Sequence, residues 1–160
     1  MKKLFAILLL SAVLVQANDC VPLTFKALSE QIGKPVSADE WAKELMKDGE
    51  PPFLPEAIKS WQEKFPENPL ICIYSALSDL KAENNEIEYD KSYLWIGRLP
   101  PELRKPDSTT NAHAALVVVS KNGPVFKIYH GVSTNRFFVE HLKPEEFFGR
   151  TYAVYGVKQP

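Results

Sequence analysis

The sequence predicts an α+β fold, in which an N-terminal group of helices packs on a C-terminal antiparallel sheet. Apolar residues recur with helical spacing only in the first half of the chain, and short runs rich in Val, Ile and Tyr occupy the second half. Between two of these runs stands Asn122–Gly123, a dipeptide typical of a tight hairpin. Helices that precede the strands, rather than alternate with them, favour the α+β class over a parallel α/β fold.

The start of the chain has the features of an exported protein. Two lysines precede an apolar stretch from Leu4 to Val15, and Ala17 offers the small residue after which a signal peptidase cuts. The apolar stretch is shorter than the ~20 residues that span a bilayer. We therefore expect a signal peptide over residues 1–17 and a single domain over residues 18–160. The mature protein is expected to be secreted or periplasmic, without stable membrane insertion.

The composition argues against nucleic acid, metals and other cofactors as ligands. The formal net charge is −1, and the chain has no basic stripe interleaved with aromatic residues, so nucleic acid is not an expected partner. The three histidines lack the spacing of a zinc site. We expect neither a metal nor another cofactor.

Three helices are predicted in the first half. An apolar stripe of Val21, Phe25, Leu28 and Ile32 follows one helix face, with Pro22 in the first turn and Gly33 closing the helix. Ser37 to Glu40 matches a capping box, which predicts a second helix that runs to about Lys47. Pro55 opens a third helix, whose apolar face comprises Leu54, Ile58, Trp61 and Phe65.

Five strands are predicted in the second half: Leu70–Tyr74, Tyr93–Leu99, Ala114–Val119, Val125–Tyr129 and Thr151–Val157. The stretches Asp79–Asp90 and Pro100–Asn111 are polar or proline-rich and predict surface loops. A short helical turn is expected around Lys143 to Phe148, just before the last strand.

Cys20 is the candidate nucleophile. A thiol at a helix N-terminus has a lowered pKa, because the unpaired N–H groups and the helix dipole stabilise the thiolate. His113 is the candidate base, since it stands at the start of an apolar run that predicts a buried strand. His130 ends the partner strand of the predicted hairpin and is the candidate that orients His113.

These residues and their order resemble the papain-like, bacteriocin-processing cysteine peptidases. The family has Asp-Cys-Gly-Pro, a helix ending in Gly and a Val-Ser helix start, and this chain has Asp19-Cys20-Val21-Pro22, Gly33 and Val36-Ser37. His113 before an apolar strand resembles the family's catalytic histidine. The run from Lys143 to Phe147, followed by the last strand, resembles its closing turn. The resemblance implies a papain-like fold and cleavage of peptide or amide bonds by Cys20 and His113.

The chain departs from the family pattern at three places. Val21 replaces the usual glycine, and His130–Gly131 stand where the family has an aspartate that orients the histidine, followed by proline. The family's oxyanion glutamine precedes the cysteine, and Gln16 is the only nearby glutamine. If the signal peptide is cut after Ala17, Gln16 is lost, and the Cys20 N–H and Asn18 remain as oxyanion donors.

A second reading stays open on the sequence alone. An exported chain with two cysteines often joins them, and a Cys20–Cys72 disulfide would exclude thiol catalysis. The protein would then be a binding or inhibitory module on the same fold, or a periplasmic partner of another protein. Transglutaminase-like and cell-wall amidase chemistries use the same order of Cys before His. The sequence does not distinguish them from a peptidase.

Overall fold

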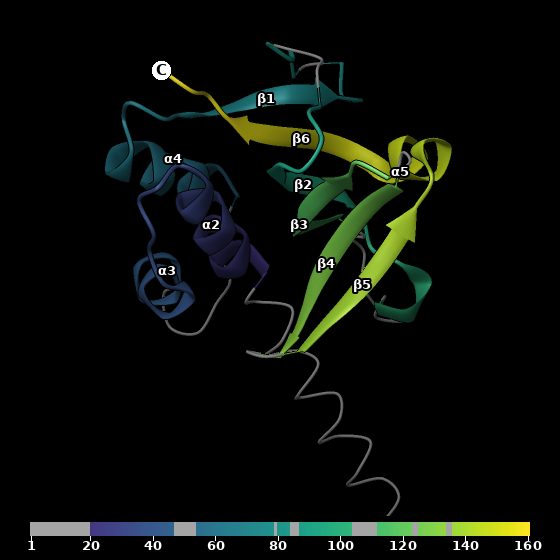
Figure 1. Ribbon diagram of the computed structural model, residues 1–160, viewed down its shortest axis with the longest axis horizontal. Helices are drawn as coiled ribbons and strands as arrows, with labels where there is room; N and C mark the ends of the chain where they lie inside the picture. The colour runs from purple at the N-terminus through teal and green to yellow at the C-terminus, as the bar shows by residue number, and fades with distance from the viewer. Residues whose placement is uncertain are drawn as a thin grey trace, which may run out of the picture.

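The fold is α+β, with helices on both faces of an antiparallel sheet (Figure 1). The computed structural model describes residues 20–46, 54–78, 80–83, 87–103, 112–122, 125–133 and 136–160. The expected signal peptide and Gly123 of the predicted hairpin turn lie outside these residues. Within the described ranges, no helix is long and apolar enough to cross a membrane.

The three predicted helices are present. They are α2 (Cys20–Gln31), α3 (Ala38–Leu45) and α4 (Leu54–Lys64), and the expected turn before the last strand is α5 (Pro144–Arg150). Helix α2 begins at Cys20, so that Pro22 lies within its first turn, where the missing N–H costs nothing. The side chain of Ser37 caps α3 by accepting a hydrogen bond from the Glu40 N–H at 3.1 Å, which confirms the predicted start.

The sheet has one strand more than the sequence predicted. Its order is β1-β6-β2-β3-β4-β5, and every neighbouring pair is antiparallel. The bounds are β1 (Leu70–Ser75), β2 (Ser92–Arg98), β3 (Ala112–Ser120), β4 (Val125–Ser133), β5 (Arg136–Leu142) and β6 (Thr151–Val157). The unpredicted strand is β5, an edge strand that pairs only with β4. Its apolar run is short and is followed by Glu140 and His141, so the pattern did not indicate a strand.

The two faces of the sheet bury two separate apolar clusters. The helix-side cluster joins α2, α3 and α4 to the sheet, with Phe25, Trp41, Trp61 and Leu94 fully buried. The opposite cluster, the α5-side cluster, contains Trp95, Ala115, Val117, Val119, Phe126, Ile128 and Phe147. Residues next to each other in β2, such as Leu94 and Trp95, fall in different clusters, because successive side chains of a strand point to opposite faces. Figure 1 shows α2, α3 and α4 on one side of the sheet and α5 on the other.

Helix α2 runs along the central strands and is fixed at its C-terminal end. The Ser92 N–H at the start of β2 donates to Gln31 Oε1 at 2.7 Å. A helix of 12 residues rises ~17 Å, which is the length of about five strand residues. Five residues beyond Ser92 is Gly97, which pairs with His113 of β3. The N-terminus of α2, with Cys20, therefore lies at the end of the sheet where Gly97 and His113 pair.

Gly97 is the tightest point of this end of the sheet. A Cβ at this position would overlap the Trp95 ring and would lie 2.6 Å from the carbonyl oxygen of Arg150. The ring of Trp95 and the backbone that links α5 to β6 can therefore pack over Gly97 only because it has no side chain.

We expect Gly97→Ala to lower the free energy of unfolding by about 1 to 3 kcal/mol, because the added methyl group must displace backbone. Gly149→Ala is the matched control, since a Cβ there meets nothing within 4 Å. Urea unfolding of the two variants checks this. Equal stability of Gly97→Ala and the unsubstituted protein would contradict the close packing described here.

Candidate functional site

Cys20 is the first residue of α2, as the sequence predicted. Its side chain is buried, with 3% of the residue exposed. The Cys20 carbonyl accepts a hydrogen bond from the Thr24 hydroxyl at 2.6 Å, which tightens the first turn. The N–H groups of this turn have no partner within the helix, so the positive end of the helix dipole faces the thiol. A helix N-terminus is a location that stabilises a thiolate, whereas burial of the side chain opposes it.

The two cysteines are thiols, and no disulfide joins them within the described part of the chain. Cys72 is on β1, the edge strand covered by α4, whereas α2 packs against β2, β3 and β4. The Cys72 Sγ–H donates to the Tyr74 carbonyl at 3.2 Å, and burial raises the pKa of this thiol. The structure thus keeps Cys72 as a small buried residue and does not contain the alternative Cys20–Cys72 disulfide.

His113 is in β3, one residue after the strand begins. The β2–β3 register is unbroken from Ser92 to Arg98, so the His113 side chain lies on the same face as Ala115 and Val117. This is the α5 side of the sheet, whereas the neighbouring Ala114 packs against the helix-side cluster. His113 and Cys20 thus share one end of the sheet, and the imidazole could reach the thiol only around that end.

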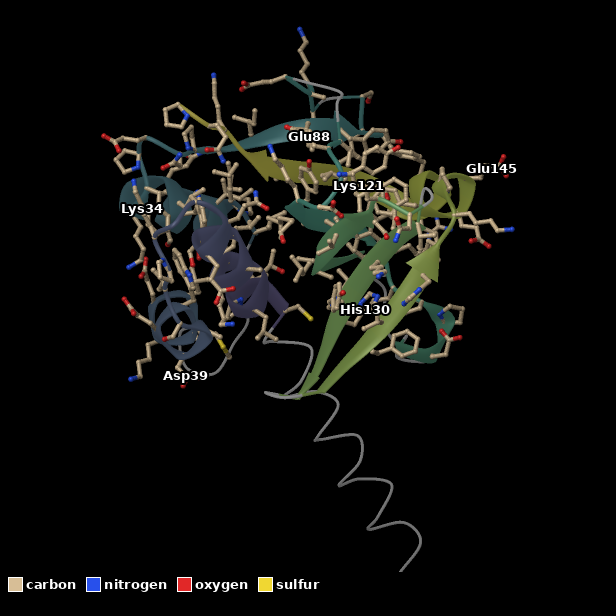
Figure 2. All side chains as sticks on the ribbon, viewed as in Figure 1. Lys34, Asp39, Glu88, Lys121, His130 and Glu145 are labelled. Carbon is tan, nitrogen blue, oxygen red and sulfur yellow. The ribbon has the colours of Figure 1, made fainter. Side chains whose placement is uncertain are left out.

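The predicted approach of His130 to His113 is present in the structure. The two imidazole rings stack with their centroids 5.4 Å apart and 29° between their planes. His130 is 1% exposed, and Trp95 packs edge-on against it at 6.1 Å. Figure 2 labels His130 on β4, the strand next to β5. Burial, and to a smaller extent His130, lowers the pKa of His113 to about 4.

His130 has an acidic partner that the sequence analysis did not predict. Its Nε2 lies 3.2 Å from Oε1 of Glu140 on β5. Arg150, the last residue of α5, donates to both oxygens of this carboxylate, at 2.5 Å to Oε2 and at 3.0 Å to Oε1. It also donates to the Arg98 carbonyl. Burial raises the pKa of Glu140, but the hydrogen bonds from His130 and Arg150 outweigh it and lower the pKa to about 2.

Glu140 and Arg150 had no visible motif in the sequence. One signal could have found Glu140: a lone carboxylate follows three apolar residues, Phe137 to Val139, in a segment long enough to pair with the preceding strand. Because β4 and β5 pair Ile128 with Glu140, the Glu140 side chain is near the α5 side of the sheet. The third histidine, His141, is exposed and does not join the site.

The other predicted site residues cannot be placed. Gln16 and Asn18, the candidate oxyanion donors, lie outside the described residues. Within the described ranges there is no cluster of three or more His, Cys, Asp or Glu side chains that could hold a metal ion. Comparisons of the chain with protein-family models, with curated protein sequences and with solved structures found no match.

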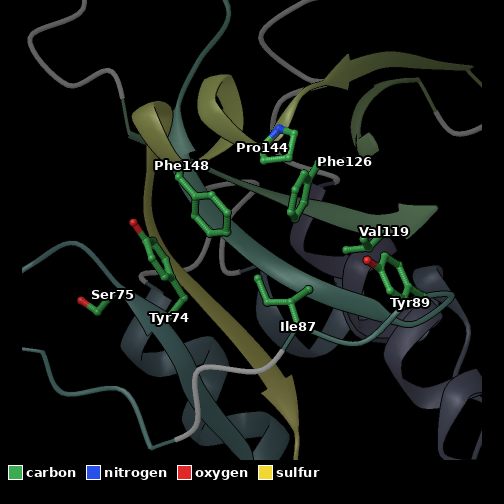
Figure 3. A pocket seen from close by; sticks show the side chains of 8 residues that line it. All are labelled: Tyr74, Ser75, Ile87, Tyr89, Val119, Phe126, Pro144 and Phe148. Carbon is green, nitrogen blue, oxygen red and sulfur yellow. The ribbon is translucent and has the colours of Figure 1, made fainter. Parts of the chain in front are cut away.

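A hollow near the α5-side cluster is separate from this site. It has a volume of about 670 Å³ and is lined mainly by aromatic and apolar side chains, including Tyr74, Tyr89, Phe126 and Phe148 (Figure 3). Val119, which also lines it, is six residues along β3 from His113, or roughly 20 Å. The hollow therefore does not form part of a Cys20–His113 centre.

The low pKa of His113 predicts a loss of stability in mild acid. In the unfolded chain this imidazole has a pKa near 6.5, and in the fold the value is about 4. The unfolded state therefore binds the proton first, so the stabilisation is complete above pH 6.5 and is lost as the pH falls toward 4. Between pH 7 and pH 5 the free energy of unfolding should fall by about 2 kcal/mol through this group. Glu140 adds to the loss only below pH 4.5.

Urea unfolding at pH 7 and pH 5 checks this. His113→Gln should show about 2 kcal/mol less acid destabilisation than the unsubstituted protein, because the variant has no imidazole to protonate. His141→Gln, which changes an exposed histidine, should keep the full effect. The same pH dependence in His113→Gln and in the unsubstituted protein would show that His113 is not the buried, neutral group described here.

Proposed function

We propose that this protein is an exported, papain-like thiol hydrolase that cleaves peptide or amide bonds with Cys20 and His113. The observation that supports this best is the shared location of the α2 N-terminus and of His113 at one end of the sheet. A helix N-terminus lowers the pKa of a thiol, and a strand end holds an imidazole at a fixed position. The α+β architecture, with the helices before the sheet, agrees with a papain-like fold.

The proposed reaction begins with attack of the Cys20 sulfur on the carbonyl carbon of the substrate. His113 accepts the thiol proton and returns it to the leaving amine, and water then hydrolyses the thioester with His113 again as the base. A pKa of about 4 keeps His113 neutral at pH 7, which is the protonation state that a base requires. The Cys20 N–H, at the positive end of α2, is the candidate donor to the developing oxyanion.

A non-catalytic binding module is the second candidate, and one observation favours it. Cys20 is 3% exposed, and the side chain of His113 lies on the face of the sheet opposite α2, α3 and α4. If the protein is a binding module, neither Cys20 nor His113 is required for ligand binding, and substitution of either residue changes only the stability of the fold. Cys20 and Cys72 are not joined, so the features of the sequence that still support this candidate are the missing orienting aspartate at His130 and the expected loss of Gln16 with the signal peptide.

A biotinylated epoxysuccinyl peptide, an electrophile that alkylates activated cysteines, separates the two candidates. We expect it to label Cys20 at pH 7 and to leave Cys72 unlabelled, because Cys20 stands at the N-terminus of α2, whereas Cys72 is in a strand and burial raises its pKa. Peptide mapping by mass spectrometry identifies the labelled residue. Cys20→Ala should abolish labelling, and His113→Ala should slow it by ~10²-fold or more, the usual contribution of a positioned base.

Cys72→Ser is the matched control and should label at the unsubstituted rate. Equal, slow labelling of Cys20 and Cys72 in the folded protein, unaffected by His113→Ala, would reject the hydrolase and support the binding module. Circular dichroism of each variant establishes that it is folded.

A further inference from the structure

The carboxylate of Glu140 is charged and is held in a fixed position next to His130. It is 9% exposed, and both of its oxygens accept hydrogen bonds from Arg150. The Arg150 guanidinium is itself held by the Arg98 carbonyl at 2.8 Å. With a pKa of about 2, Glu140 is ionised at any pH at which the protein would act. An ionised carboxylate has no proton to give, so it can only accept hydrogen bonds.

This charge determines which nitrogen of His130 carries the proton. Oε1 of Glu140 is 3.2 Å from His130 Nε2, so Nε2 must be the donor. In the neutral ring the lone pair is then on Nδ1. That atom is buried and has no hydrogen-bond partner among the described residues. A buried acceptor of this kind requires a donor, because an unmade hydrogen bond in the interior is costly.

The same reasoning extends from His130 to His113. His113 Nε2 is the other imidazole nitrogen that is buried without a partner in the described part of the chain. The two rings stack 5.4 Å apart. One bridging water could accept from His113 Nε2–H and donate to His130 Nδ1, so that both nitrogens are satisfied at once. His113 then carries its proton on Nε2 and its lone pair on Nδ1.

We propose that Arg150, Glu140 and His130 form a positioning chain that holds His113 in the tautomer with its lone pair on Nδ1. In the hydrolase proposed above, on which this last step rests, Nδ1 takes the proton from the Cys20 thiol. The products are a thiolate and an imidazolium that retains the proton on Nε2. Glu140 thus supplies the orienting carboxylate from β5 and through a second histidine. None of the three residues touches the substrate.

Nuclear magnetic resonance of the ¹⁵N-labelled protein tests the chain without any substrate. A long-range ¹H–¹⁵N spectrum of the imidazoles at pH 7 should show His113 and His130 as fixed Nε2–H tautomers, with His113→Gln used for assignment. The exposed His141 should show exchange-averaged nitrogen shifts and serves as the internal reference. An Nδ1–H tautomer at His113, or averaging like that of His141, would overturn the proposal.

Glu140→Gln tests the role of the charge. We expect His113 to lose its fixed tautomer and Cys20 labelling by the epoxysuccinyl peptide to slow by at least ~10-fold. Glu145→Gln removes an exposed carboxylate from α5, labelled in Figure 2, and should leave both readouts unchanged. If Glu140→Gln alone unfolds because Arg150 is left unpaired, the double variant Glu140→Gln, Arg150→Gln removes both charges and should give the same two changes.

The failures of the two proposals are distinguishable. A fixed Nε2–H tautomer at His113 with no labelling of Cys20 would reject the hydrolase and retain the positioning chain. Labelling of Cys20 at the same rate in Glu140→Gln, with the His113 tautomer unchanged, would retain the hydrolase and overturn the chain.

Discussion

The alternation of side chains along β2 and β3 is the constraint on which the rest of the structure depends. These central strands are covered on both faces, by α2 on one side and by the α5-side cluster on the other. A shift of one residue in register would exchange Leu94 with Trp95 and move His113 to the helix side. The hydrogen bond between Ser92 and Gln31 and the close packing over Gly97 fix this register at the two ends of β2.

The polar chain from Arg150 to His113 is stable because its charges compensate one another within the fold. Removing a carboxylate and a guanidinium from water is costly, and the cost is met only when both are well paired. Here the geometry is bidentate, and His130 uses the carboxylate lone pairs that remain. Burial, and to a smaller extent the neighbouring His130, lowers the pKa of His113 and keeps it neutral. The same burial that disfavours an imidazolium limits how readily this histidine would hold a proton in the proposed reaction.

The helices and most of the sheet could be predicted from local patterns, since capping residues and apolar periodicity act within a few residues. The Ser37 cap and the last strand, Thr151–Val157, agree with their predictions. Strand β5 could not be predicted in this way, because it forms by pairing with β4 and its own sequence lacks a clear strand pattern. Glu140 was missed for the same reason. The approach of His113 to His130 followed from the hairpin register, but the face on which His113 lies depends on α2 packing, which no single sequence reveals.

Cross-linking of Cys20 to position 113 tests most directly whether thiol and imidazole meet around the end of the sheet. In a Cys72→Ser background, His113→Cys should be bridged to Cys20 by dibromobimane, which fluoresces when it joins two neighbouring thiols. Ala114→Cys, one residue along and on the helix side of β3, is the matched control. The account predicts that Cys20 is cross-linked to position 113 at least as fast as to position 114. Cross-linking at position 114 alone would contradict it, because a side chain at position 113 would then not reach Cys20 around the end of the sheet.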